Sequence, residues 1–303
     1  MASDFETQVR ATNDKINAQV RATNDAINKR TGRPLLRAIL VGLVLGGALL
    51  VSLLIFKALF MVFAGLLIAF VSIELANALR FAGRYVPRVP TVVAAVAVVP
   101  AAFFWGAQGH LLVTLGGIVF ISIWRLAALA TAKGKAASAG AVLRDVGAAV
   151  LIMVYIAFMA GFTVLLTAQE GGQWWTLAFL IVVVSIDTGA YASGLAFGKH
   201  KMAPTISPGK TWEGFVGSAV VAVVAGVLLA LLMLQQPWWV GVILGLTMVA
   251  TATVGDLAES LIKRDLKIKD ISTWLPGHGG FLDRVDSSLL SAAAAYALFL
   301  IFA

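Results

Sequence analysis

Long runs of apolar residues fill most of the chain, and polar residues gather in short segments between them. Because a helix rises 1.5 Å per residue, about 20 apolar residues cross the hydrocarbon core of a bilayer. The runs lack the polar–apolar alternation of a membrane β-barrel. They predict nine spans: 36–56, 58–79, 91–106, 110–130, 143–167, 174–197, 214–235, 238–262 and 285–303. We therefore expect an all-α polytopic membrane protein with about nine transmembrane helices.

The composition supports insertion into a membrane. Of the 303 residues, 60% are hydrophobic and 13% are charged, whereas a soluble domain carries about 25% charged residues. The chain has no cysteine, which excludes disulfides, thiolate metal sites and cysteine nucleophiles. Any metal would need oxygen or histidine ligands. The meaning of the net charge of +8 depends on where the cations lie in a membrane protein. The charge alone is therefore no evidence for a nucleic-acid partner, and we expect none.

The cations are distributed unequally between the two sides of the predicted bundle. Of the 23 Lys and Arg residues, all but Lys57 fall in or beside the N-terminal arm and the even-numbered connections. The positive-inside rule then predicts a cytoplasmic N-terminus, cytoplasmic active-site loops and an extracytoplasmic C-terminus. No removable signal peptide is recognisable at the start of the chain. We expect a multi-pass protein of a bacterial plasma membrane.

The N-terminal arm contains a repeat with a period of 11 residues. QVRATNDKIN at 8–17 recurs as QVRATNDAIN at 19–28. Eleven residues make about three helical turns, so the repeat predicts a polar helix with a thin apolar stripe. Such a helix could lie on the membrane surface, pair with another chain or act as a solvated tether. We divide the chain into this arm, 1–34, and a transmembrane domain, 35–303.

Charged residues within spans are costly and therefore indicate function. Asp187 lies about ten residues inside its span, and Asp256 shares a helical face with Glu259, Ser260 and Lys263. This pattern predicts an acidic pocket beside a basic surface, suited to a divalent cation and phosphates. Alternatively, the acids pair with neighbouring lysines and lock helices together. For Glu74, which has no such neighbours, the structural interpretation is favoured.

The connection GKHKMAPTISPGKTWEG, at 198–214, could bind phosphate. It is not a Walker A motif, because Pro204 stands where that motif requires glycine. It nevertheless delivers Lys210 and Thr211 to the start of a helix, where free N–H groups favour a phosphate. Ser207 could donate a further hydrogen bond. An ordinary connection between spans is the alternative.

The connection at 260–288 is more specific. It combines basic residues with Asp270, Asp283 and Asp286 around a Pro/Gly-rich stretch, 276–280. Glycines let backbone N–H groups approach a polyanion, and carboxylates can bind metal. No nucleophile–base pair of the Ser–His type is evident, which favours an enzyme that positions its reactants without a covalent intermediate. His278 fits a loop hydrogen-bonding role better than that of a catalytic base.

These motifs resemble those of the phosphatidate cytidylyltransferases, also called CDP-diacylglycerol synthases. That family's signature is a serine, a Lys-Arg pair, a Lys-Asp pair, a Pro/Gly turn into His-Gly-Gly, and Asp-Arg-x-Asp. The positions that fill it are Ser260, Lys263, Arg264, Lys269, Asp270, Pro276, His278, Gly279, Gly280, Asp283, Arg284 and Asp286. The dense resemblance covers about 185–288 and includes Asp187–Tyr191 and SPGKTWEG. It does not include the repeat arm.

The resemblance implies transfer of CMP from CTP to phosphatidic acid, giving CDP-diacylglycerol and pyrophosphate, with Mg²⁺ as cofactor. It suggests Asp256 and Asp283 as metal ligands, Asp187 beside a second cation, and catalytic roles for Lys263 and Asp286. The implied substrate contacts are Ser207, Lys210, Thr211, Arg264, Lys269, His278, Gly279, Gly280 and Arg284. The bilayer itself would supply the lipid substrate, whose headgroup could enter sideways from the inner leaflet.

Other functions fit parts of the pattern. Intramembrane acids also occur in transporters and channels, although the chain shows no repeated half and the long loop motif has no evident role in transport. A structural scaffold would explain the spans but not the acids and basic loops. Among enzymes, the acceptor could be another anionic lipid, or the chain could be a CTP-dependent lipid kinase. Gly194 and Gly198 have GxxxG spacing, so a homodimer is a further hypothesis.

Overall fold

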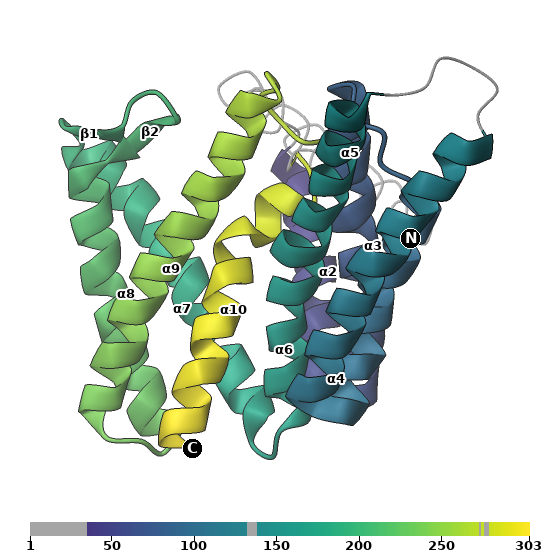
Figure 1. The fold of residues 1–303 in the computed structure, drawn as a ribbon. Coiled ribbons are helices and arrows are strands. Elements are labelled where there is room, and N and C mark those ends of the chain that lie inside the picture. Colours follow the sequence, from purple (N-terminus) through teal and green to yellow (C-terminus); the bar gives the residue numbers. More distant parts are fainter. Residues whose placement is uncertain (1–34, 132–137, 273, 276–278) are drawn as a thin grey trace, which may run out of the picture.

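A bundle of long helices, capped at one end by a small β-hairpin, makes up the computed structural model (Figure 1). The structure describes residues 35–131, 138–272, 274–275 and 279–303. The predicted repeat arm, 1–34, and His278 lie outside these residues. The first half contains α2 (Leu35–Leu54), α3 (Lys57–Phe81), α4 (Arg88–Thr131), α5 (Ala139–Leu151), the π-helical turn η1 (Ile152–Phe158) and α6 (Met159–Ala168). The second half contains α7 (Gly172–Phe197), β1 (Lys201–Ala203), β2 (Ser207–Thr211), α8 (Trp212–Leu232), α9 (Trp238–Asp265) and α10 (Leu282–Phe302).

The helices confirm the predicted all-α polytopic class but not the number of spans. Within the described ranges, seven helices are long and apolar enough to cross a membrane, with 139–168 counted as one. The expected number was nine. The difference arises because α4 contains two predicted spans, 91–106 and 110–130, and α2 counts only as a shorter apolar helix, Gly42–Leu54.

The long helix α4 doubles back on itself at Gly106. This residue has φ 60° and ψ −151°, a conformation that glycine adopts readily because it has no Cβ. Beyond the break, Gly117 packs against the first half of the same helix, since a Cβ on Gly117 would lie 3.2 Å from the Cβ of Ala94. Near its end, the Arg125 guanidinium lies 4.6 Å from the ring centroid of Tyr85, which precedes the helix. The two halves of α4 therefore run side by side in opposite directions.

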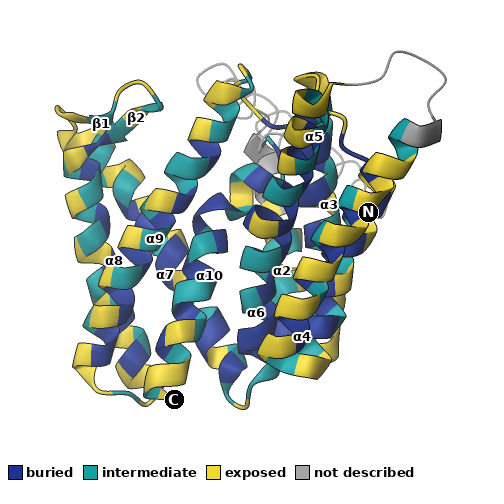
Figure 2. Cartoon of the chain, in the orientation of Figure 1, coloured by how far each residue is buried: buried dark blue, intermediate teal, exposed yellow. Residues whose placement is uncertain are grey.

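Helix α10 joins the two apolar clusters of the core. Leu282 and Leu289, near its start, pack with α3, α4 and η1, whereas Ala292 and Ala295 pack with α7, α8 and α9. Buried residues face inward between the helices and exposed apolar residues cover the outside, as expected for a surface against lipid (Figure 2). The change from one cluster to the other therefore falls between Leu289 and Ala292.

Polar contacts distinguish the two ends of the bundle. The hairpin and the end of α9 lie at one end, and the C-terminus lies at the other (Figure 1). At the end away from the hairpin, the Lys57 Nζ donates a hydrogen bond of 2.5 Å to the carbonyl of Gln169, joining two connections. At the hairpin end, the buried Arg125 guanidinium donates to Asp145 at 2.7 and 2.9 Å and fixes α4 to α5.

Candidate active site

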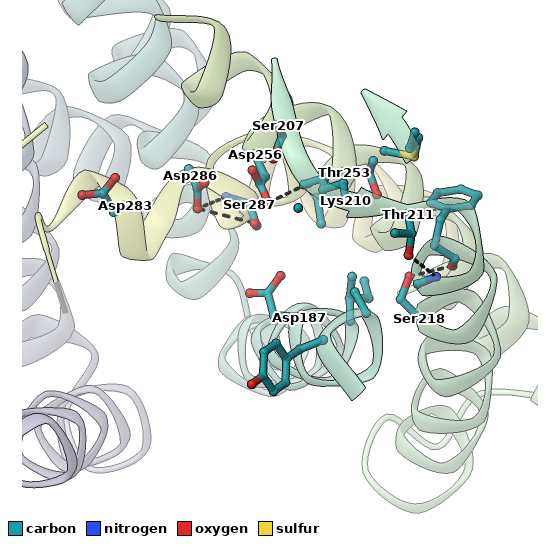
Figure 3. Close-up of a pocket in the computed structure, with 18 of the residues that line it drawn as sticks. Asp187, Ser207, Lys210, Thr211, Ser218, Thr253, Asp256, Asp283, Asp286 and Ser287 are labelled. Carbon is teal, nitrogen blue, oxygen red and sulfur yellow. Dashed lines mark hydrogen bonds and ion pairs between the residues drawn. The ribbon is translucent and has the colours of Figure 1, made fainter. Parts of the chain in front are cut away.

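A polar cavity of about 480 Å³ opens at the hairpin end of α7, α8, α9 and α10 (Figure 3). Each of these helices contributes polar side chains, and residues of β2 also line the cavity. Sequence-predicted residues that line it are Asp187, Ser207, Lys210, Thr211, Asp256, Asp283, Arg284 and Asp286. The structure thus brings together acids and cations from two connections and from helices as far apart in the sequence as Asp187 and Asp286.

The β1–β2 hairpin delivers Lys210 to this cavity. The two strands are antiparallel, with Lys201 opposite Thr211. Thr211 is the N-cap of α8, where its hydroxyl oxygen accepts the Gly214 N–H at 3.1 Å. Immediately before it, the Lys210 Nζ lies 2.6 Å from the Asp256 carboxylate on α9. This ion pair links the hairpin to the acidic wall of the cavity.

Two further contacts fasten the hairpin. At its start, the Glu213 carboxylate accepts hydrogen bonds from the Lys199 and His200 N–H groups and lies 2.6 Å from the His200 ring. At its turn, the exposed Arg264 donates a hydrogen bond of 3.1 Å from Nε to the carbonyl of Ile206. Arg264, predicted to contact substrate, therefore holds the hairpin against α9 and does not itself line the cavity.

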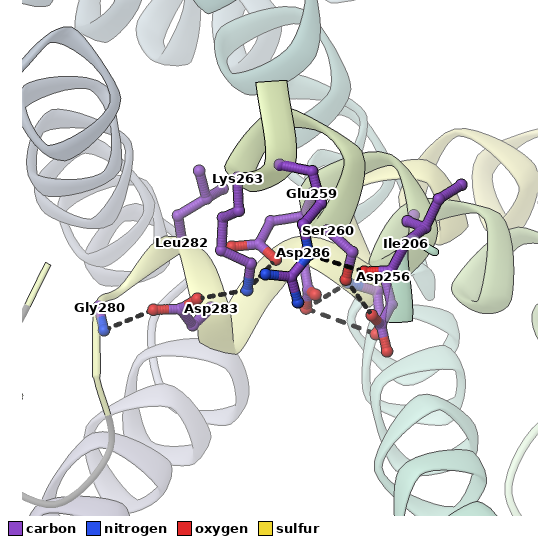
Figure 4. A network of polar contacts seen from close by, with 12 residues as sticks. Ile206, Asp256, Glu259, Ser260, Lys263, Gly280, Leu282, Asp283 and Asp286 are labelled. Carbon is purple, nitrogen blue, oxygen red and sulfur yellow. Dashed lines mark hydrogen bonds and ion pairs between the residues drawn. The ribbon is translucent and has the colours of Figure 1, made fainter. Parts of the chain in front are cut away.

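Lys263 lies between two carboxylates behind the cavity (Figure 4). Its ammonium group contacts Glu259, which is 1% exposed, and lies 3.0 Å from Asp283 Oδ1. The other Asp283 oxygen accepts the Gly280 N–H at 2.8 Å. One lysine thus compensates a buried acid and fixes the side chain of the predicted metal ligand. These contacts are the lysine–acid pairs that the alternative interpretation of the intramembrane acids expects.

Helices α9 and α10 approach closely beside the cavity. A Cβ on Gly255 would lie 2.5 Å from the Asp286 carbonyl oxygen, so the backbones touch there. The contact places Asp286, which is 9% exposed, beside Asp256. Asp286 also accepts a hydrogen bond of 2.7 Å from the Ser287 N–H. Figures 3 and 4 both place Asp286 between Asp256 and Asp283.

The predicted metal ligands line one cavity without forming a closed metal cage. Among the residues that the structure describes, no group of three or more His, Asp or Glu side chains is close enough to hold a metal ion. Asp256 contacts Lys210, and Asp283 contacts Lys263. Their role as metal ligands stays a prediction.

Some predicted substrate contacts lie away from the cavity. Lys269 is exposed and is not among the described lining residues. Gly279 pairs with Leu275 through backbone hydrogen bonds of 2.9 and 3.2 Å. Gly280 contacts Asp283 through its backbone. The two glycines shape the loop that leads into α10.

Sequence interpretation missed several residues of the site. Ser218, Thr253 and Ser287 line the cavity, but an isolated hydroxyl on an apolar helix gives no distinctive signal. Glu74, for which a structural role was favoured, contacts the segment before α10. Its charge within an apolar span was the one available signal.

A second, apolar cavity of about 290 Å³ adjoins the polar one. It is lined by side chains of α2, α3, α7 and α10, with Ile156, Ala160 and Thr163 from η1 and α6. Asp187 and Arg284 line both cavities. A molecule with a charged end and an apolar tail would match this pair of cavities.

Removing the Lys263 ammonium should destabilise the protein, because Glu259 would remain buried without its cation. We expect Lys263→Met to cost about 3–5 kcal/mol of unfolding free energy. Lys267→Met, at an exposed position just beyond α9, should cost little. The Glu259→Gln/Lys263→Met double variant should recover part of the loss. Thermal unfolding in detergent measures all three, and equal midpoints for Lys263→Met and Lys267→Met would contradict the charge-compensating role.

Comparison with known proteins agrees with the resemblance in the motifs. The sequence profile of the Cytidylyltransferase family matches residues 36–302. A phosphatidate cytidylyltransferase of Mycobacterium bovis is 39% identical over 271 residues, which cover 88% of this chain and 89% of that protein. That of Mycobacterium leprae is 37% identical over 276 residues, covering 89% and 88%. That of Brucella suis is 44% identical over 151 residues, covering 48% and 56%. The chain belongs to the cytidylyltransferase family.

Proposed function

We propose that the protein transfers CMP from CTP to phosphatidic acid, producing CDP-diacylglycerol and pyrophosphate for phospholipid synthesis. The relatives named phosphatidate cytidylyltransferase support this activity. The observation that carries the proposal is the adjoining pair of cavities, one polar and one apolar, which share Asp187 and Arg284. A nucleotide that reacts with a lipid headgroup needs such a junction between a charged and an apolar environment.

The polar cavity supplies the groups that a triphosphate requires. Lys210 lies at its mouth and Arg284 at the boundary with the apolar cavity, so cations can meet phosphates from both substrates. Thr211 and Ser207 add hydroxyl groups beside the start of α8, whose dipole favours an anion. Lys263 acts from behind by holding Asp283.

The carboxylates fit Mg²⁺, although no closed cage is formed in the described ranges. Mg²⁺ prefers oxygen ligands and commonly uses one or two carboxylates together with substrate phosphates. Asp256 and Asp283 would hold it, Asp286 would support them, and Asp187 would lie beside a second cation. When bound, Mg²⁺ would neutralise charge on the reacting phosphates.

The reaction then depends on positioning. A phosphate oxygen of phosphatidic acid attacks the α-phosphorus of CTP, and the bond from that phosphorus to the oxygen that bridges the β-phosphorus breaks. Pyrophosphate leaves with the bonding electron pair. Lys210 and Arg284 stabilise the negative charge on the reactants, and the apolar cavity holds an acyl chain so that the lipid phosphate faces the nucleotide. No protein nucleophile takes part.

We also propose nine membrane crossings, with α2 and each half of α4 spanning once. The N-terminus is cytoplasmic, the C-terminus is extracytoplasmic, and the polar cavity opens to the cytoplasm of a bacterial cell. A homodimer would need a surface other than Gly194 and Gly198. Within this chain, Gly194 packs near Gly214, and a Cβ on Gly198 would lie 3.0 Å from Thr211 side-chain atoms.

The activity is tested by transfer of label from α-labelled CTP into chloroform-soluble lipid, using purified protein, phosphatidic acid and Mg²⁺. We expect labelled lipid and an equimolar amount of pyrophosphate. Asp283→Asn should reduce turnover by about 100-fold or more while leaving insertion and folding intact. Label-free lipid from a folded wild-type protein would contradict the proposed function. Full activity of Asp283→Asn would remove Asp283 from the reaction site.

The lipid site is tested by filling the apolar cavity. Ala160→Phe should reduce turnover of dioleoyl phosphatidic acid about tenfold, because the ring would occupy space that an acyl chain needs. Dioctanoyl phosphatidic acid should be affected less, and CTP binding should not change. Ala58→Phe, at an exposed position of α3, is the matched control. Equal losses with both lipids would contradict an acyl-binding role for this cavity.

A further inference from the structure

Glu74 of α3 is buried at 1% exposure, and the reaction described above does not use it. Its carboxylate accepts three hydrogen bonds from the segment that leads into α10. The donors are the Ser272 hydroxyl at 2.5 Å and the N–H groups of Phe281 and Leu282, each at 2.9 Å. A single side chain of α3 therefore binds residues about 200 positions further along the chain.

These contacts perform the function of a helix cap. The first N–H groups of a helix have no partner within it, and a cap is usually provided by the residue just before the helix. Phe281, at that position of α10, has no side-chain oxygen and makes no cap hydrogen bond. The Glu74 carboxylate takes its place, and its negative charge matches the positive end of the helix dipole.

The capped turn contains Asp283, which extends the effect to the candidate active site. Asp283 lies in the first turn of α10 and faces Lys263 and the Gly280 N–H (Figure 4). Gly280 sits between the two acids: a Cβ there would lie 3.0 Å from Glu74 Oε2 and 3.1 Å from Asp283 Oδ2. A side chain at this position would crowd both carboxylates, so the loop passes closely between Glu74 on one side and Asp283 on the other.

Aromatic packing on the same face of α3 strengthens this attachment. Phe70, one helical turn before Glu74, stacks on Phe281 with ring centroids 5.0 Å apart and an interplanar angle of 10°. It also meets the Trp274 ring edge-on at 6.1 Å. Stacked and edge-on aromatic pairs are favourable beyond the area they bury. Helix α3 thus holds the start of α10 by one polar and one aromatic contact.

We propose that Glu74 is a positioning residue that caps α10 from α3 and thereby sets the place of Asp283 for the transfer reaction. The proposal rests on the proposed function for the reaction that Asp283 serves. The capping contact itself is independent of that function, so the two can be tested separately.

A graded set of variants tests the proposal. Glu74→Gln keeps the size of the side chain but replaces one carboxylate oxygen with an NH2 group, which cannot accept a hydrogen bond from a helix N–H group. It should reduce kcat about tenfold with little change in KM for CTP. Glu74→Leu removes all three acceptor contacts and should reduce kcat about 100-fold. Ser272→Ala removes one donor and leaves both helix N–H groups paired, so its effect should be the smallest of the three. Ser72→Ala is the matched control on α3, because the buried Ser72 hydroxyl has no partner among the described residues.

Hydrogen–deuterium exchange of the substrate-free protein provides a readout that does not depend on activity. In Glu74→Gln, the amides at the start of α10 should exchange faster than in the wild type, and in Ser72→Ala they should not change. Unchanged exchange in a folded Glu74→Gln variant would overturn the capping contact. Faster exchange with wild-type kcat would overturn the positioning role. If Glu74→Leu does not fold, Glu74→Gln decides the question, and an inactive wild type would count against the proposed function and not against the cap.

Discussion

The burial of carboxylates within an apolar bundle is the constraint on which the rest of this structure depends. An ionised carboxylate away from water is costly unless it is paired or hydrogen-bonded. Here Lys263 meets the buried Glu259 and the half-buried Asp283 of α10, and Lys210 of the hairpin meets the half-buried Asp256 of α9. Glu74 meets the backbone at the start of α10. The acids therefore attach both basic connections to the helices, and the same contacts that hold the fold together assemble the polar cavity.

This arrangement has a consequence for substrate binding in the proposed reaction. Lys210 pairs with Asp256, and Lys263 pairs with both Glu259 and Asp283. A nucleotide brings negative phosphates that suit the lysines, and Mg²⁺ brings positive charge that suits the aspartates. The metal and the nucleotide bring opposite charges to these groups, so the two together can bind at a lower electrostatic cost than either one alone. Arg284 lines both cavities, so a lipid headgroup in the apolar cavity can contact it beside the nucleotide.

Much of the fold and part of the site could be predicted from the sequence. Apolar runs locate helices well: the predicted span 214–235 corresponds to α8. Charged residues within such runs indicated Asp187 and Asp256, and the charged segments between runs indicated the two basic connections. The return of α4 at Gly106 also falls where two predicted spans meet. Contacts to backbone groups could not be predicted, because an N–H group at the start of α10 leaves no mark in the residue types. A structural role for Glu74 could therefore be favoured, but its partners could not be named. The GxxxG spacing of Gly194 and Gly198 suggested a homodimer as one hypothesis, but small residues fit any close neighbour, and here the neighbours are Thr211 and Gly214 at the start of α8.

A structure determined with Mg²⁺ and a CTP analogue that cannot be cleaved between its α- and β-phosphates would show whether the polar cavity binds the nucleotide. We predict that the triphosphate lies in the polar cavity beside Lys210, with Asp256 and Asp283 facing the metal. We also predict that the α-phosphate points toward Arg284 and the apolar cavity. A nucleotide bound elsewhere on the bundle, with the Lys210–Asp256 and Lys263–Asp283 pairs and the cavity between them unchanged, would contradict these predictions.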